Sequence, residues 1–170
     1  DIPVDTRTDL TSPYTPTLNY LWMAHPPKVI SGALTVTVSI VKTGVPVFQW
    51  AFPGDGNTTG GNPAGAHLLI WAHNNNWTKE YARWWAVPDY FLLDGPGGVL
   101  TVPLTPGRWS SVYGKRGDYN AQSLKGFNDA LRNVSSLGLT FGGGWFFGHG
   151  INIAAGTGSA RFVVQGYQVN

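Results

Sequence analysis

Strict alternation of apolar and polar residues is the feature that most limits how this chain can fold. In residues 31–42, SGALTVTVSIVK, the apolar side chains Leu34, Val36, Val38 and Ile40 share one face, and serine and threonine share the other. Successive side chains of a strand point to opposite faces of a sheet, so this period packs one face on a core and leaves the other in water. Residues 31–42 are therefore predicted to form a half-buried β-strand.

Further short runs of this kind follow, separated by segments rich in glycine and proline. Such punctuation is typical of antiparallel sheets, in which turns connect short strands. The later strands are expected at residues 45–52, 66–73, 81–85, 91–93, 99–104, 137–141, 145–153 and 160–169. About eight or nine strands indicate an all-β fold, an antiparallel sandwich or barrel, and a jelly-roll β-sandwich is the first expectation.

One segment departs from the alternation. Between residues 118 and 134 the apolar residues recur at steps of three and four, as on one face of an α-helix. The residues of that stripe are Leu124, Phe127, Leu131 and Val134. We expect one short helix near residues 120–134, with Asp118 or Asn120 as its N-terminal cap.

The length of 170 residues fits a single β-sandwich domain, residues 1–170, with no linker. Residues 1–29 differ from the rest, because their five prolines exclude a long helix. We expect this stretch to be an extended, proline-rich arm packed on the sandwich.

Charge and cysteine content exclude several classes of protein. A net charge of +2 without a basic cluster is too small for binding nucleic acid, which requires many cations on one face. The absence of cysteine excludes disulfides and cysteine-bound zinc. The longest apolar runs fall short of the roughly 18 residues that indicate a membrane span, so none is expected.

The composition suits a secreted protein that meets glycans, because 14% of the residues are aromatic and only 12% are charged, with abundant glycine, threonine and asparagine. The first residues, DIPVD, lack the basic start and apolar stretch of a secretory signal. We interpret the sequence as that of a processed or trimmed chain.

Catalytic motifs are scarce. Ordinary glycoside hydrolysis needs two carboxyl groups, but Glu80 is the only glutamate, most aspartates fall in turns, and Asp129 falls on the expected helix. The serine-hydrolase pattern G-x-S-x-G and the phosphate-binding P-loop are missing. The histidines are scattered, so no metal site is predicted. These observations favour a protein without catalytic activity.

Eight tryptophans are more than one small core requires. An indole presents a flat apolar face to a sugar ring, and neighbouring polar groups bind the hydroxyls. Trp77, in the polar stretch HNNNWTKEY, is the strongest candidate for a ligand contact, and His73 begins that stretch. For His67, which shares a strand face with His73, a structural role is favoured.

The strand ARWWAVPDY places its two adjacent tryptophans on opposite faces. If Trp84 points into the core, then Tyr81, Arg83 and Trp85 form an exposed row of two aromatic rings and a cation. Such a row is either a sugar platform or the edge of a large core, and the sequence leaves both open.

The last strands, GHGINIAAGTGSARFVVQGYQV, resemble the closing hairpin of jelly-roll carbohydrate-binding modules, over about the final quarter of the chain. The resemblance implies secretion, attachment to polysaccharide through aromatic platforms and, often, a structural calcium ion. Asp55, Asn57 and Asp94 offer oxygen ligands on loops, but no dense acidic motif surrounds them, so no cofactor is predicted.

The function expected from these features is non-catalytic binding of polysaccharide or oligosaccharide. The ligand-binding residues predicted are Trp77, Trp85, Tyr81, Arg83 and His73. Two alternatives stay open: a structural or host-interaction β-sandwich, and a polysaccharide lyase that takes its base and its carboxylate-neutralising cation from Tyr113, His73, His149 and Arg83. The sequence leaves the glycan and the oligomeric state undetermined.

Overall fold

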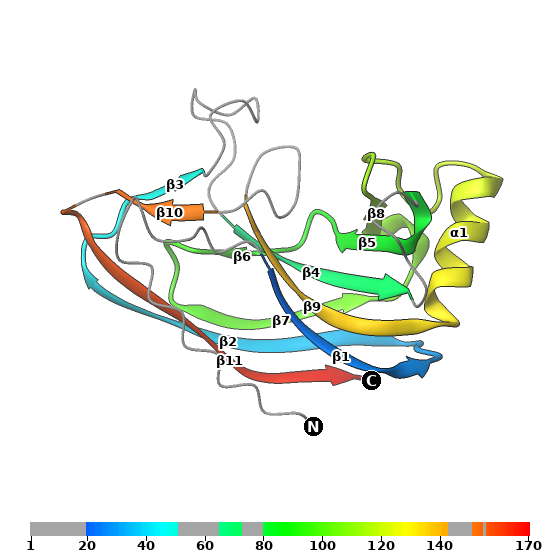
Figure 1. Cartoon of the computed structure of the whole chain (residues 1–170), viewed down its shortest axis with the longest axis horizontal. Coiled ribbons are helices and arrows are strands. Elements are labelled where there is room, and N and C mark those ends of the chain that lie inside the picture. Colours follow the sequence, from blue (N-terminus) through cyan, green and yellow to red (C-terminus); the bar gives the residue numbers. More distant parts are fainter. Residues whose placement is uncertain (1–19, 51–64, 73–79, 143–150, 155) are drawn as a thin grey trace.

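The computed structural model describes residues 20–50, 65–72, 80–142, 151–154 and 156–170. Within them the chain is mostly β, with one α-helix and two short 3₁₀ helices (Figure 1). In chain order the elements are β1 (Tyr20–Lys28), β2 (Ala33–Gly44), β3 (Phe48–Trp50), β4 (Gly65–Ala72), η1 (Glu80–Ala82), β5 (Arg83–Ala86), β6 (Phe91–Leu92), β7 (Gly97–Pro103), η2 (Pro106–Arg108), β8 (Trp109–Ser111), α1 (Ala121–Leu131), β9 (Val134–Gly142), β10 (Ile151–Ile153) and β11 (Gly158–Val169).

The strands form two main antiparallel sheets and a small ribbon. The larger sheet has the order β1-β9-β4-β5-β8, with β6 also paired to β4, and the smaller has the order β11-β2-β7. The ribbon joins β3 to β10. Pairing across the chain is nested, because β2 pairs with β11, β3 with β10 and β4 with β9.

Apolar side chains from both main sheets meet in one core. Val36 of β2 and Leu68 of β4 are fully buried. Phe141 of β9 meets Phe162 of β11 edge to face, with ring centroids 5.0 Å apart. The core therefore lies between the six-stranded and the three-stranded sheets, as in a β-sandwich.

The predicted strand at residues 31–42 is confirmed as β2, and its alternation matches its burial residue by residue. Strands β1 and β8 lie outside the nine segments that the sequence predicts as strands, and the strand predicted at 81–85 begins only at Arg83, because Glu80–Ala82 form η1. β1 occupies residues 20–28 of the expected arm and pairs only with β9 among the described strands, so its two prolines lie at a sheet edge, where a missing N–H is tolerated. Residues 1–19 lie outside the described residues.

The predicted helix is confirmed as α1, and the side chain of Asn120 caps it by accepting a hydrogen bond from the Ser123 N–H at 2.8 Å. Its buried stripe differs from the prediction. Leu124 is 41% exposed, whereas Ser123, Phe127 and Ala130 are buried. Phe127 packs edge to face on Trp84, so the helix is oriented by this contact and Leu124 faces outward.

α1 lies at one end of the molecule beside β5 and β8, and the β3–β10 ribbon lies at the other end (Figure 1). At this end of the molecule, α1 contacts β4 and both 3₁₀ helices. Residues about 40 positions apart in the chain are thereby brought together at η1 and α1.

Candidate functional site

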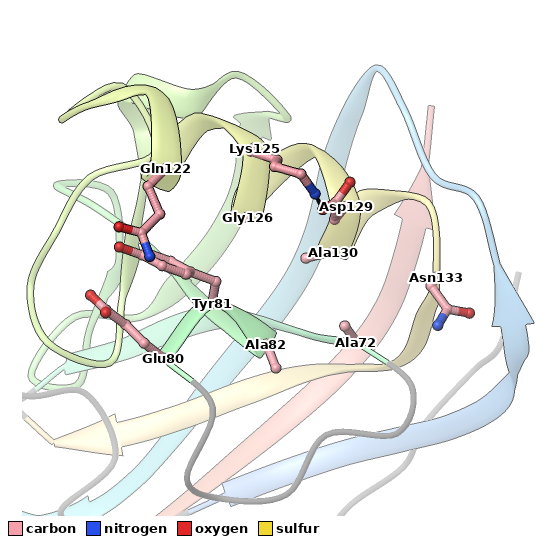
Figure 2. Close-up of a pocket in the computed structure, with 10 residues that line it drawn as sticks. All are labelled: Ala72, Glu80, Tyr81, Ala82, Gln122, Lys125, Gly126, Asp129, Ala130 and Asn133. Atoms are coloured by element: carbon pink, nitrogen blue, oxygen red, sulfur yellow. Dashed lines mark hydrogen bonds and ion pairs between the residues drawn. The ribbon is translucent and has the colours of Figure 1, made fainter.

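An open groove of about 640 Å³ runs between η1 and α1 (Figure 2). Small side chains keep it wide, and both helices contribute polar groups. The small residues are Ala72, Ala82, Gly126 and Ala130. The larger lining residues are Glu80, Tyr81, Gln122, Lys125, Asp129 and Asn133.

The spacing of residues on α1 explains why the helix turns a polar face to the groove. Gln122, Gly126, Asp129 and Asn133 follow one another at steps of four, three and four residues, which places them on one side of a helix and its final turn. Phe127 points instead into the core. The helix therefore presents one face to the sandwich and another to the groove.

Tyr81 is held rigidly between α1 and β5. Its ring stacks on Trp84, with centroids 5.8 Å apart and ring planes 19° apart. On the helix side, a Cβ at Gly126 would lie 2.5 Å from the Cβ and Cγ of Tyr81, so only glycine permits this approach. In Figure 2 the side chains of Tyr81 and Gln122 extend toward the end of the groove where Glu80 lies. Tyr81 thus offers the groove its hydroxyl end rather than a free ring face.

Glu80 is tied to the turn that follows β8. Its carboxylate lies 3.1 Å from the ammonium of Lys115, and the hydroxyl of Ser111 donates to it at 3.4 Å. The hydrogen bond to Glu80 is the largest cause of a raised pKa at Lys115. The charge of Glu80 is therefore compensated within the protein.

Asp129 is compensated in the same way. Its carboxylate accepts a hydrogen bond from Lys125, one helical turn earlier, and lies 3.4 Å from the guanidinium of Arg132. The hydrogen bond from Lys125 holds the pKa of Asp129 below its ordinary value. Asp129 is consequently ionised at neutral pH and has no proton to donate to a leaving group.

Among the predicted ligand-binding residues, Tyr81 lines the groove. His73 and Trp77 lie outside the described residues. The segment that contains them, residues 73–79, joins Ala72 to Glu80, and both of these flanking residues line the groove.

The prediction of an exposed row formed by Tyr81, Arg83 and Trp85 is wrong for Arg83 and Trp85. Trp85 is 1% exposed and Arg83 5% exposed. β5 lies inside the six-stranded sheet, between β4 and β8, and the face that carries Arg83 and Trp85 is covered as well as the core face that carries Trp84. The guanidinium carbon of Arg83 lies 5.5 Å from the ring centroid of Trp85 and 5.8 Å from that of Trp71, so the cation serves to pack two indoles.

The residues named for a lyase are not assembled by the described structure. Tyr113 is 64% exposed in the turn after β8, whereas Arg83 is buried in the sheet. His73 and His149 lie outside the described residues. A buried Arg83 is unsuited to neutralising the carboxylate of a bound uronate.

His67 has the structural role that the sequence favours. It is buried, its Nδ1–H donates to the carbonyl of Ala86 at 3.1 Å, and its ring stacks on Tyr90 with centroids 4.7 Å apart. Burial lowers the pKa of His67 to about 4, so the imidazole is neutral in the folded protein at pH 7.

Sequence reasoning missed most of the groove. The sequence points to neither Gln122 nor Asn133 as a site residue, and it offers Glu80 and Asp129 only as candidate catalytic acids. A local signal exists, because the polar residues of α1 recur at helical spacing around Gly126. That signal identifies a polar helix face, but its partner, η1, is supplied only by the tertiary fold.

Within the described ranges, no three metal-binding side chains gather into one group. Of the three loop residues considered for calcium, Asp55 and Asn57 lie outside those ranges, and the backbone carbonyl of Asp94 accepts a hydrogen bond from Lys42. No helix in the described part of the chain is long and apolar enough to cross a membrane.

A scan against protein-family models finds no match for this chain, and searches of curated proteins and of solved structures find none either. The case for a function therefore depends on the geometry and chemistry of the groove.

Proposed function

We propose that this protein binds polysaccharide or oligosaccharide without cleaving it, and that the groove between η1 and α1 is its sugar site. The observation that supports this proposal is an open groove whose lining combines amides, carboxylates and a tyrosine hydroxyl. A ligand rich in hydroxyl groups requires donors and acceptors side by side. The volume, about 640 Å³, falls within the roughly 300–1,000 Å³ of small-molecule sites.

The apolar face of the sugar needs an aromatic partner, and in this proposal Trp77 supplies it. The ring of Tyr81 is already stacked on Trp84, so it is not a free platform. Trp77 belongs to the segment that connects two groove-lining residues, Ala72 and Glu80. An indole has the flat surface that pyranose rings bind.

Binding without cleavage is favoured by the state of the acidic groups. A general acid for glycoside hydrolysis must carry a proton, which calls for a raised pKa. The pKa of Asp129 is lowered instead, and Glu80 is paired with Lys115. Elimination from a uronate calls for an accessible cation such as Arg83, which is buried.

We further propose that the sandwich has jelly-roll topology. In a jelly roll, a long antiparallel ribbon folds over on itself, so strands of the first half pair with strands of the second half in nested order. The pairs β2–β11, β3–β10 and β4–β9 follow this order. Secretion is also part of the proposal, on the basis of composition.

The proposal is tested by a glycan array, followed by titration of the positive glycans with tryptophan fluorescence. Trp77→Ala is expected to weaken binding roughly 10-fold or more, as removal of a central aromatic contact does, and to leave the melting temperature nearly unchanged. Trp22→Ala is the matched control, since Trp22 is 50% exposed and does not line the groove. Affinities of both variants are best measured by calorimetry, because each loses a fluorophore.

Three outcomes contradict the proposal. Silence across the array, together with concentration-dependent self-association, favours the structural or host-interaction alternative. New reducing ends or unsaturated products show catalysis. Equal losses in Trp77→Ala and Trp22→Ala show that neither tryptophan reports on a defined site.

A further inference from the structure

We infer that the groove selects neutral sugars over uronates and sulfated sugars, with the amides of Gln122 and Asn133 as its recognition groups. This inference rests on the proposed function and narrows its ligand class. The juxtaposition that carries it is a groove in which the ionic groups bind each other and the amides are left for a ligand.

The ionic groups of the groove are mutually engaged. Glu80 is paired with Lys115 at 3.1 Å. Asp129 is bound by Lys125 and, at 3.4 Å, by Arg132. A ligand that used one of these charges would first have to displace its present partner.

The amides are differently placed. No hydrogen bond joins the side chain of Gln122 or Asn133 to any part of the chain that the structure describes. The two residues lie toward opposite ends of the groove, with Lys125 and Asp129 between them (Figure 2). Each amide has a donor and an acceptor, which matches a sugar hydroxyl, itself a donor and an acceptor.

An acidic sugar meets less favourable chemistry here. Its carboxylate or sulfate would enter a groove that two protein carboxylates already line, those of Glu80 and Asp129. Among the described residues, the cation that lines the groove is Lys125, and it is bound to Asp129. An anionic group that entered the groove would lose its hydration without finding a free partner among the described cations there, and it would make no hydrogen bond that a neutral hydroxyl would not also make.

The first test compares neutral oligosaccharides with uronate and sulfated oligosaccharides of similar length, at low and high salt, on the whole chain. We expect binding to neutral sugars only, with an affinity that salt does not change, because no net ion pair forms. Binding that prefers acidic sugars and weakens with salt overturns the inference and leaves carbohydrate binding intact. Absence of binding to both classes overturns the proposed function as well.

The second test removes the recognition groups. Gln122→Ala and Asn133→Ala are each expected to weaken binding to the neutral sugar roughly 2- to 10-fold, the effect of one lost hydrogen bond. Asn128→Ala is the matched control, since Asn128 is exposed on the same helix and does not line the groove. Wild-type affinity in both groove variants, with urea unfolding unchanged, overturns the assignment of the amides.

Discussion

At the scale of single residues, the groove depends on a glycine. Gly126 lies inside α1, where glycine is less favourable than alanine by about 1 kcal/mol. The cost is explained by Tyr81, whose Cβ and Cγ occupy the space that a side chain at this position would take. The close approach fixes Tyr81 against the helix and sets the width of the groove.

From this contact we predict that Gly126→Ala destabilises the protein when Tyr81 is present and stabilises it when the Tyr81 side chain is removed. In the wild-type chain the substitution is expected to destabilise the protein by ~1–3 kcal/mol, because the added methyl group overlaps the tyrosine. In a Tyr81→Gly background, which removes both the Cβ and the Cγ, the same substitution is expected to stabilise by up to ~1 kcal/mol, the ordinary gain in helix propensity. Urea unfolding of the four proteins in this cycle measures both effects, and additive values would refute the contact.

At the scale of elements, α1 shows how a helix can be predicted correctly and its orientation wrongly. The apolar side chains in residues 120–134 recur at helical spacing, and this spacing predicts the helix. Which of them enters the core depends on the surface that the helix meets. Phe127 packs on Trp84, and this large contact turns Leu124 outward and brings Ser123 and Ala130 inward.

Two alanine substitutions distinguish the predicted stripe from the observed one. Phe127→Ala is expected to cost ~3–5 kcal/mol, because it leaves a cavity against a buried indole. Leu124→Ala is expected to stay within ~0.5 kcal/mol of the wild type, since Leu124 lies outside the core with 41% of its surface exposed and alanine suits a helix. The free energies of unfolding are compared by chemical denaturation. A large loss of stability in Leu124→Ala would show that Leu124 belongs to the buried face, as the sequence predicts.

At the scale of the whole molecule, the sandwich contains a buried titratable group that links its stability to pH. Burial holds His67 neutral in the folded state, with a pKa of about 4 against 6.5 when exposed. Below pH 6.5 the unfolded chain therefore binds more protons at this site than the folded chain does. Above pH 6.5 His67 is neutral in both states and does not lower the free energy of unfolding. As the pH falls from 6.5 toward about 4, protonation of His67 in the unfolded chain lowers that free energy.

The loss attributable to His67 amounts to about 3 kcal/mol over this window, at 1.36 kcal/mol per pKa unit. His67→Asn keeps a donor for the Ala86 carbonyl and cannot titrate. Free energies of unfolding are measured for both proteins from neutral pH down to about pH 4. We expect the wild-type curve to fall more steeply than that of the variant, and parallel curves would show that His67 is not the group responsible.

The sequence alone indicated most of the strands and the place of the helix, because these depend on periodicity between neighbours in the chain, but it did not indicate β1 or β8. β2 follows directly from the alternation of residues 31–42, and α1 from the change of period after residue 118. Tyr81, which the sequence predicts as a ligand-binding residue, lines the groove.

Only the tertiary structure decided which faces are covered. Alternation assigns Trp84 and Trp85 to opposite faces, but both are buried, and whether a face of the sheet is covered depends on residues distant in the chain. The groove is likewise non-local, since η1 and the polar face of α1 meet across about 40 residues of chain. Local periodicity determines the elements, whereas long-range packing determines which of their side chains remain available to a ligand.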